Sequence, residues 1–211
     1  MKGTSPGLDR ARIVRAALKH IDRHGIEAVG VRQLAAELGV APNALYSYVR
    51  DKDDIIHGAV ELAFGNLEIP QASGETWQER IIGLCRWLRQ RLLEHPELVS
   101  VPRFTEGAPF PFISFPTTVG MTLQEAGLEG QELIETTFAI FYHTVGFVTM
   151  EVARAQHGVP TESDEFLVSQ LDAEKFDAAA FEKVAELVPL IRTLDLSSVF
   201  ERSLRAMLNG L

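Results

Sequence analysis

The residues best suited to chemistry in this chain lie in one short run, Pro42–Val49. Its members include hydrogen-bonding side chains where a solvated helix usually carries glutamate and lysine: Asn43, Tyr46, Ser47 and Tyr48. Together with the small Ala44, side chains of this kind suit contact with base edges and phosphates. Arg32 and Lys52 flank the run: Lys52 can contact phosphate, and Arg32 can contact phosphate or guanine. The alternative for each is a solvated surface charge.

Two short helices must position these side chains. The sequence predicts helices over Val31–Leu38 and Pro42–Val49, joined by three residues that begin with Gly39. Helices of this length form only by packing, and a short link containing glycine makes them cross steeply, as in a helix-turn-helix. Ala35 is small where the helices approach, and Pro42 suits the first turn of the second helix. An ordinary helical corner within a bundle is the alternative.

The rest of the chain also has the helical period. Apolar residues recur at helical spacing, and no stretch alternates apolar and polar residues between hairpin turns. We expect further helices over about 9–24, 53–67, 76–94, 116–126, 131–156 and 164–187, a short one opened by Pro189, and a last one capped by Ser197 or Ser198 and closed by Gly210. The expected fold class is all-α.

Charge is divided unevenly along the 211 residues. The net charge is −9, but residues 1–53 carry nine Lys and Arg against six Asp and Glu, a balance of +3, which leaves −12 for the remainder. A basic head is compatible with DNA, whereas the acidic whole would be repelled by it. Because a split of this size can also arise by chance, charge alone leaves both interpretations open.

Composition and motifs exclude several classes. With 46% hydrophobic and 23% charged residues the chain is globular in type. The single cysteine, Cys85, excludes a disulfide framework or a cysteine-built zinc site. We do not expect an enzyme, because the sequence has no phosphate-binding glycine loop, no His-Glu-x-x-His and no nucleophile elbow. It also lacks a signal peptide and an uninterrupted apolar run of about 18 residues, so we expect a cytoplasmic protein.

The run from Val31 to Lys52 resembles the DNA-binding head of the TetR family of transcriptional regulators. Its specific part is Leu45-Tyr46-x-Tyr48-Val49-x-x-Lys52, followed by the apolar pair Ile55 and Ile56. Later segments resemble the effector-binding domain of the tetracycline-repressor branch: Gly146-Phe147-Val148 leading to Glu151, Val188-Pro189-Leu190-Ile191, and Phe200-x-x-x-Leu204-x-x-x-Leu208-x-Gly210. Residues from about 155 to 180 have no counterpart in this match.

The resemblance implies three parts: a helix-turn-helix DNA-binding domain over residues 1–52, a connecting helix over 53–70, and a helical ligand-binding and dimerisation domain over 71–211. It places the second short helix in the major groove and gives a DNA-binding set: Arg32, Pro42, Asn43, Ala44, Tyr46, Ser47, Tyr48 and Lys52. Tyr46 can also pack against the core of the head. The sequence departs from the family at Gly30, where a Thr or Ser commonly caps the helix and contacts phosphate. The missing hydroxyl weakens the start of the helix by about a few tenths of a kcal/mol.

Homodimers are also implied, built from about residues 131–156 and 197–210. A dimer is expected physically as well, because one short helix reads few base pairs and a two-fold dimer reads a palindrome with half-sites roughly 34 Å apart. Gly146 and Ala153 are seven residues apart, on one helix face. They either let a partner helix approach closely or pack within one subunit.

For the effector site we expect a space among the later helices, roofed by the Phe104–Phe115 segment, which is rich in proline and aromatic residues. The expected lining is Trp87, Phe104, Phe112, Phe115, Met121, Phe138, Phe141 and His143. The alternative for each is ordinary core packing. His143 is either a hydrogen-bonded core histidine or the one polar group that orients an effector. Such a lining suits a hydrophobic ligand.

These observations predict a ligand-responsive DNA-binding regulator, in its simplest form a repressor that a small, largely hydrophobic effector releases from a palindromic operator. No cofactor is predicted, and the polar residues considered for a metal site are too scattered to form one: His95, His143, Glu151 and His157. The alternative is a helical protein-interaction module that does not bind DNA.

Overall fold

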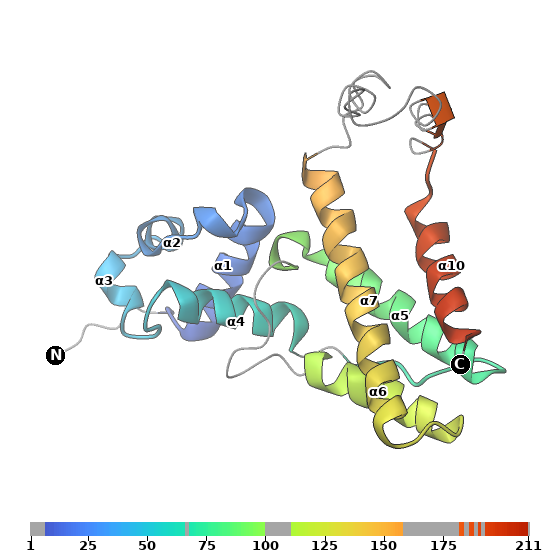
Figure 1. The fold of residues 1–211 in the computed structure, drawn as a ribbon. Coiled ribbons are helices and arrows are strands. Elements are labelled where there is room, and N and C mark those ends of the chain that lie inside the picture. The colour runs from blue at the N-terminus through green and yellow to red at the C-terminus, as the bar shows by residue number, and fades with distance from the viewer. Residues whose placement is uncertain are drawn as a thin grey trace. The chain divides into compact units, whose positions relative to one another are not determined.

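A computed structural model describes residues 7–65, 68–99, 111–157 and 193–210, with 182–183, 186–187 and 190. Throughout these ranges the regular elements are helices and no strand occurs, so the predicted all-α class is confirmed (Figure 1). The chain forms two compact units, Met1–Val148 and Thr149–Leu211.

Two helices form the frame of the N-terminal head. α1 (Arg10–His24) begins at Asp9, whose carboxylate accepts a hydrogen bond from the Arg12 backbone N–H at 2.6 Å. α4 (Lys52–Phe64) begins in the same way at Asp51 and packs along α1. A Cβ on Gly58 would lie 2.6 Å from Cγ2 of Val14. The close approach of α1 and α4 therefore requires glycine at this position.

The predicted helix-turn-helix is present between them. After the short 3₁₀ turn η1 (Ile26–Ala28), α2 (Val31–Leu38) ends at Gly39, which has the left-handed φ of 69° that favours glycine. α3 was expected to reach Val49 but covers only Pro42–Leu45. Hydrogen-bonded turns follow it, in which Leu45 O accepts from the N–H groups of Tyr48 and Val49. Tyr, Ser and Val favour the helix less than Ala or Leu, so the helix ends early.

Three longer helices complete the first unit: α5 (Trp77–Glu94), α6 (Pro111–Glu125) and the start of α7 (Gly130–His157), with the 3₁₀ turn η2 (Pro96–Leu98) after α5. The predicted start of α6 at Pro116 is wrong, because the helix begins five residues earlier, at Pro111. Pro111 suits the first turn, and the interior Pro116 is tolerated where the hydroxyls of Thr117 and Thr118 donate to the carbonyls of Ile113 and Ser114.

The core of this bundle is apolar and includes one thiol. Buried side chains from α5, α6 and α7 form it, among them Leu84, Leu88, Phe115, Val119, Ile140 and Phe141. Burial raises the pKa of the Cys85 thiol to about 12, an effect opposed by its hydrogen bond with Thr144 of α7. Cys85 is therefore a core residue that links α5 to α7.

Over residues 130–156, α7 reaches a mean hydropathy of 1.2 in its most apolar 18-residue window and is long enough to cross a membrane. The sequence contains no uninterrupted apolar run of about 18 residues here, because threonines and glutamates are spread along the helix. One such helix among those described is weak evidence for a membrane span, since the core helix of a soluble protein passes the same test.

In the second unit, α10 (Leu196–Leu208) buries Phe200, Leu204 and Leu208 at four-residue spacing. Its N-cap is Asp195, whose carboxylate accepts from the backbone N–H groups of Ser197 and Ser198. The expectation that a serine caps this helix is wrong, because the ionised carboxylate is the stronger acceptor. The helices expected over 164–187 and after Pro189 lie largely outside the described residues.

Candidate functional site

The side chains of α3 and the following turn divide into an inner and an outer set. Leu45 and Val49 are buried and fasten the segment to the head. Pro42, Asn43 and Ser47 are exposed, Ala44 and Tyr48 are half-buried, and Tyr46 is 54% exposed. Tyr46 thus faces outward rather than filling the core of the head. The outer set presents amide, hydroxyl and phenol groups on one short segment.

The start of α2 lacks a side-chain cap. Gly30 occupies the N-cap position and makes no side-chain hydrogen bond there. A Cβ on Gly30 would clash with the carboxamide of Gln33, which folds back over the glycine. Arg32, next to it, is exposed. Because Gly30 has no side chain, the Gln33 carboxamide occupies the space where a Thr or Ser side chain would lie.

Lys52 already has a protein partner. It is the first residue of α4, and its Nζ donates to the Glu27 carbonyl of η1 at 3.4 Å. An ammonium group has three donors, so this one contact leaves capacity for a phosphate oxygen. The contact also ties η1 to α4, close in the sequence to α3.

Two further residues, not included in the sequence-based set, shape this surface. The side chain of Arg50, between α3 and α4, is 84% exposed. Asp54 accepts from the Arg50 backbone N–H at 2.8 Å and from Nη2 of Arg10 at 2.9 Å. Asp54 therefore fixes the turn after α3 to the start of α1. The signal available in the sequence was the four-residue spacing of Arg50 and Asp54, which is too common to assign a role.

The predicted effector residues lie in different environments. Phe115 and Phe141 are buried with ring centroids 6.2 Å apart, and Trp87 and His143 are half-buried. Met121 and Phe138 lie at the surface. Phe104 and the side chain of Phe112 are outside the described residues. The structure thus brings Phe115 and Phe141 together inside the bundle and leaves Met121 and Phe138 on its exterior.

His143 lies beside an aromatic neighbour, with its ring centroid 6.1 Å from that of Phe147. Burial lowers the pKa of His143 from its ordinary value of 6.5, because desolvation disfavours the charged ring. The neutral imidazole can both donate and accept a hydrogen bond.

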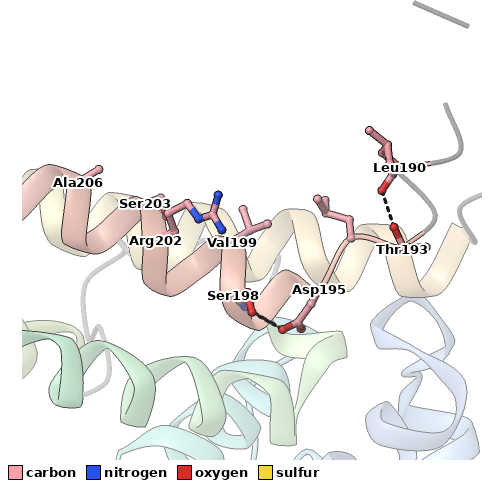
Figure 2. Close-up of a pocket in the computed structure, with 9 residues that line it drawn as sticks. Leu190, Thr193, Asp195, Ser198, Val199, Arg202, Ser203 and Ala206 are labelled. Carbon is pink, nitrogen blue, oxygen red and sulfur yellow. Dashed lines mark hydrogen bonds between the residues drawn. The ribbon is translucent and has the colours of Figure 1, made fainter. Parts of the chain in front are cut away.

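A groove of about 540 Å³ lies along α10 in the second unit. None of the predicted effector residues is among the residues that line it. Figure 2 shows Val199, Arg202, Ser203 and Ala206 on α10, and Leu190, Thr193 and Asp195 on the segment that leads into it. The Ser198 hydroxyl is hydrogen-bonded to Asp195, and the Thr193 hydroxyl donates to the Leu190 carbonyl. Its lining is Leu190, Thr193, Leu194, Asp195, Ser198, Val199, Arg202, Ser203 and Ala206. Leu190 and Leu194 are exposed leucines, so this is an open apolar groove.

An apolar stripe also runs along α7. Ile134, Phe138 and Tyr142 follow one another at four-residue spacing, and all three are exposed. The rings of Phe138 and Tyr142 contact each other with centroids 5.8 Å apart. Gly146 continues the spacing, and a Cβ there would meet nothing within 4 Å. Contiguous exposed apolar side chains of this kind are typical of protein interfaces.

Within the described ranges, no three His, Cys, Asp or Glu side chains gather closely enough to hold a metal ion. Nothing in this part of the chain therefore suggests a metal ligand set.

Two family models match the chain. Residues 13–59 match bacterial regulatory proteins of the tetR family, and residues 69–211 match the tetracyclin repressor-like C-terminal domain. The first match includes the helix-turn-helix, and the second runs from before α5 to the end of the chain.

Individual proteins agree with these models. An HTH-type transcriptional regulator of Saccharopolyspora erythraea is 30% identical over 178 residues, which are 84% of this chain and 75% of that protein. The TetR family protein ActR of Streptomyces coelicolor, solved in complex with actinorhodin, has the same fold, with a TM-score of 0.74 and 22% identity over 98% and 96% of the two chains. BioQ, solved with its natural double-stranded DNA operator, is 30% identical with a TM-score of 0.57, over 71% of this chain and 91% of that one.

Proposed function

Because the chain belongs to the TetR family of bacterial regulatory proteins, we propose that it is a repressor that leaves a palindromic DNA operator when a small effector binds. The observation that carries the proposal is the helix-turn-helix of α2 and α3. Its Leu45 and Val49 are buried, and its polar Asn43, Tyr46 and Ser47 are exposed. Relatives bearing the same head are named transcriptional regulators, and BioQ was solved with DNA.

The outer set has the chemistry for the major groove. The Asn43 carboxamide can bond bidentately to adenine, and Tyr46 and Ser47 can donate to base edges or phosphates. Arg32, Lys52 and Arg50 supply positive charge around the segment. Pro42, Ala44 and Tyr48 complete the proposed contact surface. Asn43 is the residue expected to carry the most sequence information, because its two hydrogen bonds are directional.

A homodimer is proposed through about residues 131–156 and 197–210. The exposed stripe of Ile134, Phe138 and Tyr142 supports it on α7, and the apolar groove supports it on α10. Exposed apolar area of this extent is stabilised when a second copy covers it. Two heads can then read the two halves of a palindrome.

The effector is proposed to be small and largely hydrophobic. The match to a tetracyclin repressor-like C-terminal domain supports a ligand-binding role for the bundle. Phe115 and Phe141, whose rings meet inside the bundle, are the central candidates for effector contact. The further candidates are Trp87, the neutral His143, Phe104, Phe112, Met121 and Phe138. Such a regulator acts where the DNA is, in the cytoplasm.

Selection of bound duplexes from a random pool tests the proposal. Wild-type protein should enrich a palindrome, and Lys52→Ala and Tyr46→Ala should both weaken its binding. Lys183→Ala, which removes one exposed positive charge outside the head, is the matched control and should bind as wild type does. Enrichment of no duplex by the wild type would favour the helical interaction module instead.

A further inference from the structure

One carboxylate joins the turn after α3 to the start of α1. Asp54 lies on the first turn of α4, and only 12% of its side chain is exposed. Its Oδ2 accepts a hydrogen bond from the Arg50 backbone N–H at 2.8 Å, and its Oδ1 accepts one from Nη2 of Arg10 at 2.9 Å. Both oxygens of this carboxylate therefore have a donor from another part of the head.

The Arg50 guanidinium is the looser of the two cationic partners of Asp54. Nη2 of Arg10 lies 2.9 Å from the carboxylate, whereas Nε of Arg50 lies 4.0 Å from it, and the Arg50 side chain is 84% exposed. A carboxylate that is already paired with one arginine attracts a second one more weakly, because the first pair has no net charge. Asp54 therefore holds the Arg50 backbone while the Arg50 guanidinium extends into solvent.

Arg50 also continues the outer side of the segment that we propose to read DNA. The Val49 N–H bonds to the Leu45 carbonyl, so the chain keeps a helical turn as far as Val49. Leu45 and Val49 are four residues apart and both are buried, whereas Tyr46 and Arg50, the residues that follow them, are both exposed. Because four-residue spacing brings side chains to one side of a helical turn, Arg50 follows Tyr46 on the outer side.

Charges of both signs meet at this place. Asp51 caps α4 by accepting from the Asp54 backbone N–H at 2.7 Å, so the positive end of the helix dipole offsets its charge. Asp53 is exposed on the first turn of α4. With Asp54 these are three carboxylates, against three cations: Arg10, Arg50 and Lys52. A phosphate contact here therefore depends on where the Arg50 guanidinium is held, rather than on an excess of positive charge.

We propose that the Arg50 guanidinium contacts a phosphate of the operator, and that Asp54 is the positioning residue that holds Arg50 there through its backbone N–H. The inference rests on the proposed function. A guanidinium can form two parallel hydrogen bonds with a phosphate, and phosphate contacts fix the register of a protein on the duplex. The ion pair between Asp54 and Arg10 makes the start of α1 part of the same support.

The salt dependence of binding tests the phosphate contact. The dissociation constant of full-length protein for the selected palindrome is measured by fluorescence anisotropy at several salt concentrations. Arg50→Ala should make the slope of log affinity against log salt shallower by about 2 for a dimer, since each lost phosphate contact changes it by about 0.9. Arg50→Lys should restore most of the slope, because the charge returns. Arg23→Ala, which removes an exposed arginine from the last turn of α1, is the matched control and should keep the wild-type slope.

Asp54→Asn separates positioning from charge. Loss of a carboxylate by itself raises affinity for DNA, because one repulsive charge is removed. The positioning role predicts the opposite sign: binding should weaken about fivefold, because a neutral carboxamide forms weaker hydrogen bonds with Arg50 and Arg10 than a carboxylate does. In an Arg50→Ala background the same change should cost no affinity, since the guanidinium that it positions is absent. Asp53→Asn removes an equal charge without removing the contact to Arg50, and should bind at least as tightly as wild type.

The outcomes that would overturn the inference are distinct. Circular dichroism and thermal unfolding check that each variant is folded, and Arg50→Ala changes only an exposed side chain. A wild-type salt slope in Arg50→Ala would overturn the phosphate contact. Binding by Asp54→Asn as tight as that of Asp53→Asn would overturn the positioning role. A wild type that enriches no duplex would overturn the proposed function, and this inference with it.

Discussion

Nδ1 of His95 lies 3.0 Å from Oδ1 of Asp22, so the residue that ends α5 is hydrogen-bonded to the last turn of α1. The His95 ring also meets Phe64 of α4 edge-on, with centroids 6.0 Å apart and an interplanar angle of 80°. One side chain at the end of α5 thus contacts both frame helices of the head. This relationship links the bundle that we propose to bind the effector with the head that we propose to bind DNA.

The Asp22–His95 pair should contribute measurably to holding the head on α5. We expect Asp22→Asn and His95→Gln to be non-additive in the free energy of unfolding, with a coupling of about 0.5 kcal/mol, because both side chains are partly exposed and solvent weakens the pair. Urea unfolding of the two single variants and the double variant at pH 6 measures the coupling. Strict additivity would show that the pair contributes nothing.

Gly58 is predicted to be indispensable for packing α4 on α1. Gly58→Ala should lower the free energy of unfolding by about 1–3 kcal/mol, because the new Cβ would press on Cγ2 of Val14. Gly83→Ala is the matched control within helix α5: its Cβ would lie 3.9 Å from the nearest atom, so the change should raise stability by about 0.5–1 kcal/mol. Thermal unfolding of both variants measures the difference, and equal effects would contradict the close approach of α1 and α4.

Cys85 should be chemically inert in the folded protein. With its pKa raised to about 12 by burial, the thiol has almost no thiolate at pH 8 and no access for a reagent. Labelling of the thiol with an aromatic disulfide should be slow in buffer. It should be rapid in about 6 M guanidinium, a concentration that unfolds even very stable domains and exposes the thiol. Rapid labelling of the native protein would mean that the α5–α7 contact opens.

The α7 stripe is predicted to be a subunit interface. Tyr142→Glu places a charge among exposed apolar side chains and should shift the protein from dimer to monomer in sedimentation experiments, because a buried unpaired charge is strongly unfavourable. Leu62→Glu, at an exposed leucine of α4, is the control and should leave the dimer intact. A dimer that persists in Tyr142→Glu would move the interface elsewhere.

Sequence patterns located the local features well. Gly39, at the end of α2, was readable because the end of a helix depends on near neighbours in the sequence. The early start of α6 at Pro111 and the Asp195 cap were not, since proline and serine each suit more than one position at a helix start. Both are errors about helix boundaries rather than about the existence of a helix.

Contacts between distant residues escaped sequence analysis for a different reason. Asp22 and His95 are 73 residues apart, and His20 and Glu37 are 17 apart, so no periodicity links them. Each pair consists of common surface residue types whose partners are fixed only when the helices pack. Most of the proposed DNA-binding residues follow one another along a single segment, so the sequence alone could group them, whereas the proposed effector residues come from several helices.

The central claim is that the head binds duplex DNA through phosphate and base contacts, and its most direct test is the salt dependence of that binding. A dimer making on the order of six phosphate contacts should lose roughly a thousandfold in affinity for the selected palindrome between 50 and 200 mM salt. Asn43→Ala should keep this slope while losing preference for the palindrome over a scrambled duplex. Binding that does not change with salt, or no binding to any duplex, would contradict the account.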